Sequence, residues 1–310
     1  MTNKPIRIGV SMTSSYRGSD SRAIARQMIE RAAAARSAGL DSLFLGDHHA
    51  NPTPYMQNVP MLGRLLAEWG DATAGCLFLL PMWNPVLVAE QVGTLASIAE
   101  GPFVVQCSLG YGEESFRAMG TTMKTRPSAF EESLDIVRRL CLGERVSSAG
   151  RFRFEDAVIS PPPPDGVSYW IASMSDPSID RAARLADGWL ASPGESVANV
   201  IAAGERYRAR CAEVGRPVGA CAVRRDVFVA GNHEEAERVY ATVTSKGYRG
   251  FDPANVVCGT VPDVVAEFAA LGRAGFTDVL IRHLLDDQEL VLASYRRLAS
   301  VRTELGHRAG

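Results

Sequence analysis

Short apolar runs alternate along the chain with longer segments in which apolar residues recur at helical spacing. The short runs are rich in β-branched, Leu and Phe residues, which predicts strands. These runs lie at residues 6–11, 42–46, 74–80, 103–109, 169–172, 188–191, 220–230 and 278–282. The longer segments, rich in Ala, Leu and Arg, predict helices at residues 21–38, 61–69, 85–100, 128–142, 177–185, 197–214, 233–246, 261–274 and 288–305.

This regular alternation predicts one α/β domain over residues 1–310. Strands that are apolar on both faces are typical of a parallel sheet covered by helices. Because eight such units can close into a ring without edge strands, we expect a (β/α)8 TIM barrel. Two stretches interrupt the alternation. Residues 145–164 predict a β-hairpin and a proline-rich connector, and residues 246–258 predict an insertion. Each is either a lid at the C-terminal face of the barrel or surface decoration.

The composition is that of an ordinary globular protein, with 46% hydrophobic and 22% charged residues. The formal net charge of −2 argues against nucleic acid or a membrane surface as partner. No apolar run approaches the ~20 residues that span a bilayer, and the N-terminal sequence lacks the features of a secretory signal. We therefore expect a cytoplasmic protein.

The cysteines are scattered along the chain, and none forms a C-x-x-C pair. They are Cys76, Cys107, Cys141, Cys211, Cys221 and Cys258. This spacing predicts reduced and partly buried thiols rather than a disulfide framework or a zinc site.

Polar residues gather just after the predicted strands. Active sites of such barrels lie at the carboxyl ends of the strands, so these residues are the candidates for chemistry. They are Asp47, His48 and His49 after the second strand, residues 81–84 after the third, residues 110–114 after the fourth, residues 173–175 after the fifth, and Arg282 and His283 after the last.

The histidine doublet has two interpretations. A metal-dependent barrel hydrolase would take its ligands from Asp47, His48, His49, Glu113 and His283. Adjacent histidines on a regular strand point to opposite faces, which disfavours one shared ion. We therefore favour His48 and His49 as hydrogen-bonding or acid/base groups beside an organic ligand, with one of them bracing the loop, and predict no metal site.

Two further loops have small or helix-capping residues. Gly110 and Gly112 match part of a dinucleotide fingerprint, but its third glycine is missing. These glycines are expected to allow close approach to a flat ligand or a tight turn. Residues 173–175 join a strand to a helix, with Asp176 placed as the cap and Pro177 at the first helical position. Free N–H groups at such a junction favour an anion, which predicts a phosphate site, with ordinary capping as the alternative.

Four stretches resemble the luciferase-like monooxygenase family, which includes bacterial luciferase, alkanesulfonate monooxygenases and F420-dependent barrel enzymes. They are AGLDSLFLGDHH, LPMWNPVLVAEQVGTLASIAEG, WIASMSDPSIDRAARLADGWLAS and CGTVPDVVAEFAALGRAGFTDVLI. The four stretches occur in the family's order over almost the whole chain. The resemblance is therefore more specific than any single motif.

The resemblance implies a flavin-type cofactor, FMN or coenzyme F420, and redox chemistry on a small organic substrate. It implies catalytic roles for His48, His49 and Glu113. The residues implied to contact the cofactor are Asp47, Phe78, Leu79, Gln106, Gly110, Ser173, Met174 and Ser175, the last three around its phosphate. In this family the end of the third strand, here residues 77–80, often has a non-proline cis peptide bond. A homodimer and, with FMN, a separate flavin reductase are also implied.

The chain departs from the family's pattern before and within the fourth strand and at the end of the fifth. Residues 99–102 are Ala-Glu-Gly-Pro where the family commonly has Ser-Gly-Gly-Arg, and residues 172–173 are Ala-Ser where Gly-Gly is frequent. These departures keep open a third interpretation, a degenerate barrel that binds a ligand without catalysis. The first interpretation remains a flavin-type monooxygenase or F420-dependent oxidoreductase.

Overall fold

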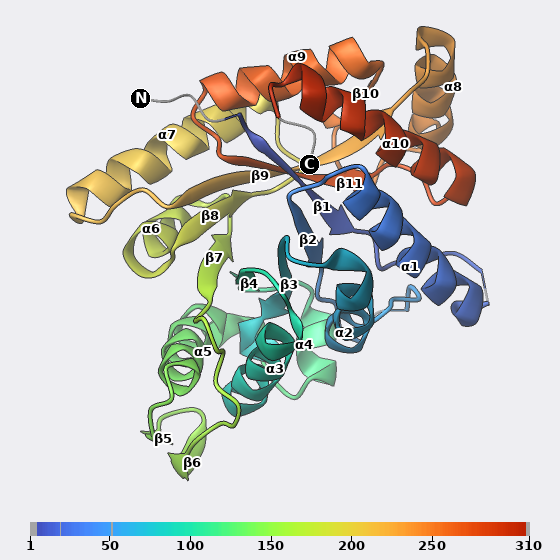
Figure 1. The fold of residues 1–310 in the computed structure, drawn as a ribbon. Helices are drawn as coiled ribbons and strands as arrows, with labels where there is room; N and C mark the ends of the chain where they lie inside the picture. Colours follow the sequence, from blue (N-terminus) through green and yellow to red (C-terminus); the bar gives the residue numbers. More distant parts are fainter. Residues whose placement is uncertain (1–4, 19, 51, 308–310) are drawn as a thin grey trace. The chain divides into compact units, whose positions relative to one another are not determined.

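The computed structural model describes residues 5–18, 20–50 and 52–307. Figure 1 shows its strands and helices. The strands are β1 (Arg7–Met12), β2 (Ser42–Leu45), β3 (Thr73–Leu79), β4 (Phe103–Ser108), β5 (Val146–Ala149), β6 (Arg153–Ala157), β7 (Ser168–Ala172), β8 (Gly188–Ala191), β9 (Ala220–Val229), β10 (Val257–Gly259) and β11 (Asp278–His283). The helices are α1 (Ser21–Ser37), α2 (Asn58–Trp69), α3 (Pro85–Ile98), α4 (Glu113–Ala118), α5 (Arg126–Cys141), α6 (Asp176–Leu185), α7 (Val197–Glu213), α8 (His233–Thr244), α9 (Val261–Arg273) and α10 (Gln288–Glu304).

The predicted strands and helices are all present, with ends shifted by a few residues. The hairpin expected within residues 145–164 is the antiparallel pair β5–β6. Two elements differ from the prediction. Helix α4 forms where a polar loop was expected, and β10 begins at the end of the stretch interpreted as an insertion.

In hydrogen-bonding order the strands of the main sheet run β10-β9-β11-β1-β2-β3-β4-β7-β8, and β8 also pairs with β9. The registers described for this sheet are parallel. The return of β8 to β9 closes the sheet into a (β/α)8 barrel, as the sequence predicts. Strand β10 pairs with the C-terminal half of β9.

The chain divides into two compact units, which are described separately. Unit 1 comprises residues 1–13, 18–43 and 170–310, and unit 2 comprises residues 14–17 and 44–169. The single domain expected from the sequence stays a prediction.

In unit 1, close packing between neighbouring strands and helices explains several residue choices. A Cβ atom on Gly188 would lie 2.7 Å from the Trp170 side chain and 2.8 Å from the Ala220 Cβ, so only glycine fits there. The indole of Trp189 on β8 stacks on Tyr207 of α7 with ring centroids 5.6 Å apart, which attaches this helix to the sheet. Helices α1 and α10 lie side by side, and α9 lies beside α10 (Figure 1).

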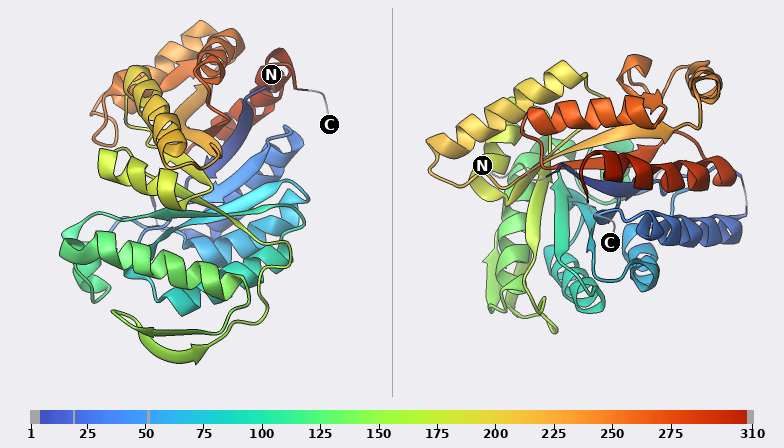
Figure 2. Two further views of the ribbon diagram at one scale, coloured as in Figure 1. Left: turned by 90° about the vertical axis from the view of Figure 1, so that its left-hand side faces the viewer. Right: turned by 45° about the horizontal axis from the view of Figure 1, so that its top comes forward.

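In unit 2, strands β3 and β4 pair directly, and helices α3 and α5 pack together. A Cβ atom on Gly75 would lie 1.9 Å from the Val104 carbonyl oxygen, so glycine permits this close strand pairing. The side chain of Asn84 accepts a hydrogen bond from Val86 N at 2.9 Å and caps α3, which begins at Pro85 as predicted. The β5–β6 hairpin projects from unit 2 next to α5 (Figure 2).

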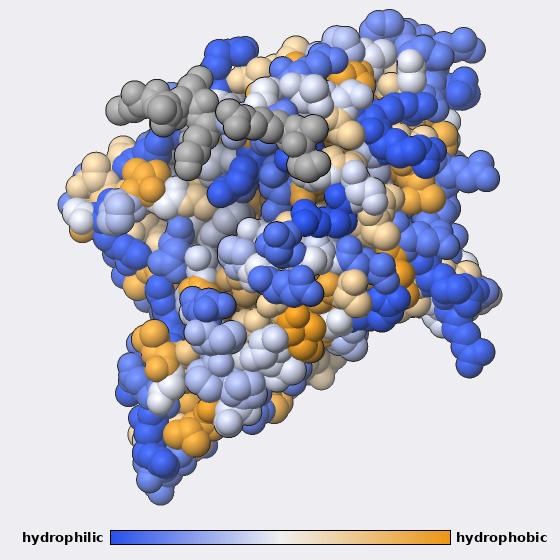
Figure 3. Space-filling model, in the orientation of Figure 1, coloured by the Kyte–Doolittle hydropathy of each residue, from blue (hydrophilic) through white to orange (hydrophobic). Residues whose placement is uncertain are grey.

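The surface and the cysteines agree with the composition. Figure 3 shows one face of the molecule, where polar residues predominate and apolar residues form small, separate patches. Within the described ranges, no helix combines the length and the apolar character needed to cross a bilayer. All the cysteines are free, and burial raises the pKa of both Cys141 and Cys258 to about 11. The cysteines are buried or half-buried, as the sequence predicts.

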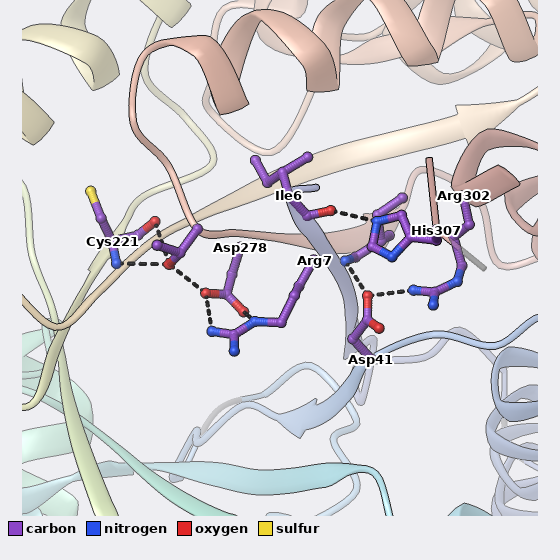
Figure 4. Close-up of polar contacts among 9 residues, drawn as sticks. Ile6, Arg7, Asp41, Cys221, Asp278, Arg302 and His307 are labelled. Carbon is purple, nitrogen blue, oxygen red and sulfur yellow. Dashed lines mark hydrogen bonds and ion pairs between the residues drawn. The ribbon is translucent and has the colours of Figure 1, made fainter. Parts of the chain in front are cut away.

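A network of polar contacts joins β1, β11 and the C-terminal helix within unit 1 (Figure 4). Arg7 donates to both carboxylate oxygens of Asp278, each at 2.8 Å. The Thr277 hydroxyl donates to the same carboxylate at 2.6 Å. Asp41 accepts from the backbone of β1 and from Arg302. These contacts tie the first strand to the last strand and to α10.

Replacing Arg7 with methionine is expected to lower the free energy of unfolding by about 2 kcal/mol, because the buried Asp278 carboxylate loses two of its donors. Denaturant titration measures the change. The control is Arg64→Met, which removes an exposed pair with Glu68 on α2 and should cost no more than ~0.5 kcal/mol. Equal losses of unfolding free energy in the two variants would show that the Arg7–Asp278 pair stabilises the fold no more than an exposed ion pair does.

Candidate active site

Asp47 follows β2 and connects it to the end of β3. Its carboxylate is buried, and Oδ2 accepts hydrogen bonds from Leu79 N and from Trp83 Nε1, both at 2.8 Å. Two donors on one oxygen fix the position of the carboxylate. Asp47 therefore fixes the loop after β2 against the turn that follows β3.

His49 packs behind this carboxylate. Its Nε2 lies 3.0 Å from Asp47 Oδ1, but the two atoms lack the directional geometry of a hydrogen bond. The imidazole and the Trp83 indole pack edge to face, with ring centroids 5.1 Å apart. His49 is buried. Of the two neighbouring histidines it is the one that braces the loop, and its predicted catalytic role stays a prediction.

His48 lies between two tyrosines and is half-buried. Its ring centroid is 5.5 Å from that of Tyr55 and 6.1 Å from that of Tyr111. Its carbonyl oxygen accepts a hydrogen bond from Gln57 Nε2 at 3.1 Å. Partial burial lowers the pKa of His48, and the charge of Asp47 only partly opposes this effect. At neutral pH the ring is therefore uncharged and offers one acceptor and one donor nitrogen.

A pocket of about 320 Å³ opens beside His48 in unit 2. Its lining comprises His48, Ala50, Pro52, Tyr111, Gly112, Glu113, Glu114 and Ser115. Gly110 and Gly112 adopt positive φ angles of 75° and 87°, which turn the chain sharply between β4 and α4. This turn places Glu113, the first residue of α4, in the same pocket as His48. The structure thus brings together two of the three predicted catalytic residues.

The ends of β3 and β4 hold the next group of predicted cofactor contacts. Gln106 pairs with Leu77 across the two strands, and its buried side-chain Nε2 has no hydrogen-bond partner. Phe78 is fully buried and meets Trp83 edge-on, with centroids 5.4 Å apart. The backbone N–H of Leu79 is taken by Asp47. An unpartnered buried amide is costly, so Gln106 is the residue of this group that most needs a ligand.

The expectation of a cis peptide bond within residues 77–80, which came from the family resemblance, is wrong. Within the described ranges the cis bond is Ser160–Pro161, so the bonds at the end of β3 are trans. The turn after β3 is held instead by the Asp47 carboxylate and continues into a short 3₁₀ turn, Leu80–Met82.

The predicted phosphate loop belongs to unit 1. Ser173 N donates to Leu190 O, and its carbonyl oxygen accepts from Trp189 Nε1 at 2.9 Å. Ser175 is the N-cap of α6 and its hydroxyl donates to the Ser178 hydroxyl at 3.0 Å. The predictions of Asp176 as the cap and of Pro177 as the first helical residue are each wrong by one residue, because Asp176 already begins the helix. Phosphate binding by Ser173, Met174 and Ser175 stays a prediction.

Arg282 and His283, the polar residues at the end of the last predicted strand, make their contacts within unit 1. Arg282 donates to both carboxylate oxygens of Asp226, at 2.6 and 2.7 Å. His283 is buried against Tyr295, with ring centroids 4.3 Å apart, and burial lowers its pKa to about 3. In the part of the chain that the structure describes, no three His, Cys, Asp or Glu side chains are grouped to hold a metal ion. The hydrolase interpretation therefore has no ligand set among these residues.

Two residues at the start of α2 hold the site and were not predicted. Asn58 is buried and its Nδ2 donates to the Leu77 carbonyl at 2.6 Å, while Gln57 holds the His48 carbonyl. Both contacts join α2 to the ends of neighbouring strands. The predicted helix began at residue 61, after these residues, because Pro60 interrupts the apolar pattern. A polar pair before an apolar helix is too common a feature to identify such a clamp.

Gly46 makes room for Tyr55 beside His48. A Cβ atom on Gly46 would lie 2.6 Å from the Tyr55 hydroxyl oxygen. Gly46→Ala is therefore expected to displace Tyr55, expose His48 to water, and raise the pKa of His48 toward its ordinary value of about 6.5. An NMR titration of the imidazole measures this shift. Gly63→Ala on α2 is the control, because its Cβ would meet only Leu95 at 3.8 Å.

Comparisons with known proteins give the family. The model of the luciferase-like monooxygenase family matches residues 6–282. The F420-dependent glucose-6-phosphate dehydrogenase of Nakamurella multipartita is 28% identical over 210 residues, which cover 63% of this chain and 59% of that protein. The enzyme of the same name from Mycobacterium avium is 26% identical, over 58% of this chain and 57% of that protein. The chain thus matches less than two thirds of the length of these curated relatives.

Solved structures show the same fold. An F420-dependent secondary alcohol dehydrogenase with an F420–acetone adduct has a TM-score of 0.78 at 17% identity, covering 96% of this chain and 100% of that one. The FMN-bound oxygenating constituent of 3,6-diketocamphane monooxygenase from Pseudomonas putida has a TM-score of 0.81 at 18% identity, covering 96% of this chain and 97% of that one. The TIM-barrel fold is therefore confirmed, and relatives of the chain use F420 or FMN. The chain belongs to the luciferase-like monooxygenase family.

Proposed function

We propose that this protein is an F420-dependent oxidoreductase acting on a small organic substrate. The observation that carries the proposal is the shared pocket of His48 and Glu113, two proton-transferring side chains facing one space. The names of the curated relatives favour F420. An FMN-dependent monooxygenase is the second candidate, favoured by the fold likeness to an FMN-bound enzyme.

Among the described residues, one buried side-chain atom is suited to hydrogen-bond a flavin-type ring. The buried Gln106 Nε2 has no partner, and the ring system of a flavin or deazaflavin has carbonyl oxygens and ring nitrogens that accept hydrogen bonds. Gln106 would therefore hold the ring by donating this bond. Tyr111, a residue that is 69% exposed, offers an aromatic surface in the lining of the pocket.

When bound, F420 would supply the carbon that accepts or releases a hydride. The chain's own contribution is to bind, orient and move a proton. The neutral imidazole of His48 would take the proton from a substrate hydroxyl. Glu113 would stabilise the positive charge of the protonated imidazole or pass the proton to water. Asp47 and Trp83 act indirectly, because they fix the loop that carries His48.

A titration with each cofactor tests this proposal. Binding of F420 and of FMN is measured by tryptophan fluorescence and calorimetry, each in oxidised and reduced form. We expect F420 to bind more tightly and Gln106→Leu to raise its Kd about tenfold, as the loss of one buried hydrogen bond predicts. Gln91→Leu on α3 is the control and should leave Kd unchanged. Failure of both cofactors to bind would overturn the function; tighter FMN binding would favour the second candidate.

The partner predictions also stand as proposals. The family resemblance supports a homodimer, which light scattering of the purified protein tests. If FMN is the cofactor, a separate flavin reductase is required, because the chain offers only part of a dinucleotide fingerprint. Dependence of turnover on an added flavin reductase, with reduced FMN restoring activity without it, would support that partner.

A further inference from the structure

Among the residues that the structure describes, the pocket beside His48 has acidic side chains and no basic one besides the histidine. Glu113 and Glu114 are the acidic residues of its lining, and no lysine or arginine contributes to the lining that the structure describes. His48 does not offset these carboxylates at neutral pH, because burial keeps its pKa low. Behind the histidine lies the buried carboxylate of Asp47, with its hydrogen bonds directed to β3 and Trp83.

The cations close to the pocket in sequence do not enter its lining. Arg126 Nη1 donates to the Gly110 carbonyl at 3.0 Å, which holds it on the turn between β4 and α4. Arg117 is exposed on the last turn of α4, and Lys124 lies on a separate short turn. A phosphate dianion in the pocket would therefore face two carboxylates without a countercharge. At separations of several ångströms, each carboxylate weakens the binding of an anion several-fold.

The rest of the lining suits an uncharged organic molecule. Ala50, Pro52 and Gly112 provide apolar or backbone surface, and the exposed ring of Tyr111 provides a flat aromatic one. Ser115 adds a hydroxyl that can donate or accept a hydrogen bond. A volume of about 320 Å³ is at the small end of the range for ligand sites.

We infer that this pocket takes an uncharged organic substrate and excludes phosphate esters. The inference rests on the proposed function, because it assigns the substrate class of the same site. It also separates this chain from the relatives that it matches, whose names give glucose 6-phosphate as substrate. Chemically, the substrate would be an alcohol, or the corresponding carbonyl compound, without an acidic group.

A matched pair of probes tests this inference without relying on turnover. Benzyl alcohol and benzyl phosphate differ only in the phosphate group, and each is titrated into the protein while the His48 ring resonances are followed by NMR. We expect the alcohol to shift these resonances at a concentration at least about tenfold lower than the ester does. Raising the salt from about 0.05 to about 0.5 M should narrow the difference, because salt screens the repulsion.

Charge reversal gives the second arm of the experiment. Glu114→Lys should improve binding of the ester relative to the alcohol at least about tenfold, and Glu114→Gln should give a smaller change in the same direction. Glu155→Lys makes the same charge change on the exposed β5–β6 hairpin and should alter neither probe.

Three results overturn the inference: the ester binds as tightly as the alcohol, Glu114→Lys changes nothing, or neither probe reaches His48. The cofactor titration is read separately. Ester preference in a protein that binds F420 would contradict only the substrate class, whereas absent cofactor binding would contradict the proposed function itself.

Discussion

Replacing His48 with glutamine is expected to lower kcat/KM about 10²–10⁴-fold, the loss typical of removing a positioned proton-transferring group. Glutamine keeps hydrogen-bonding capacity and a similar length but does not exchange a proton near neutral pH. His48 is half-buried and held through its backbone by Gln57, so the substitution should preserve the fold and cofactor binding. Steady-state kinetics at saturating F420 measure the effect.

A pH profile distinguishes proton transfer by His48 from a structural role. If the neutral imidazole is the base, kcat/KM of the native enzyme falls as the pH drops through the lowered pKa of His48, at some value below about 6.5. The variant should lose this limb of the profile. His233→Gln, an exposed histidine on α8, is the control and should keep both the rate and the profile. A His48→Gln enzyme with an unchanged acid limb would assign the proton transfer to another group.

The fold could be predicted because two periodicities in the sequence agree with each other. Runs such as those at β3 and β4 have apolar side chains on both faces and are buried at almost every position, as expected of a strand covered by helices on its outer face. Pro85, preceded by Asn84, marks the start of α3 through a local rule that tertiary contacts did not override. Helix α4 was missed because its six residues follow two glycines with positive φ and include only one buried side chain.

The candidate site was predicted in part, because strand ends are where such barrels place functional groups. That position identified the loops that contain Asp47, His48 and Glu113, and the family resemblance singled out these residues within them. Their different roles were not predictable. Sequence order does not show that the Trp83 indole reaches Asp47, or that the neighbouring histidine lies behind the carboxylate and not in the pocket. These contacts depend on side-chain directions that only the folded packing sets.

His283 shows why a polar residue at a strand end is not by itself a functional residue. His283 comes two residues after Ile281 in β11, so the two side chains point to the same face of the sheet. The His283 ring lies against Tyr295 of α10. Its Nε2 has no partner, and the positive charge of Arg31 adds to the effect of burial on its pKa. Arg31 itself is fixed by Gln288 and by the Asp286 carbonyl. The imidazole must therefore stay neutral in the folded protein.

The buried His283 is expected to make the folded state sensitive to acid. Its pKa is about 3 in the folded state and about 6.5 in the unfolded chain. Above pH 6.5 both states are neutral and the group adds no pH dependence; below it the unfolded chain gains a proton that the folded state refuses, so stability falls until about pH 3.

At pH 4 this difference amounts to about 3 kcal/mol. His283→Phe removes the titrating group while keeping an aromatic ring against Tyr295, so between pH 7 and pH 4 the variant should lose about 3 kcal/mol less of its unfolding free energy than the native protein. Urea titrations at both pH values give the four free energies. Because other groups titrate equally in both proteins, they cancel in the comparison, and parallel losses would mean that His283 is protonated within the folded state.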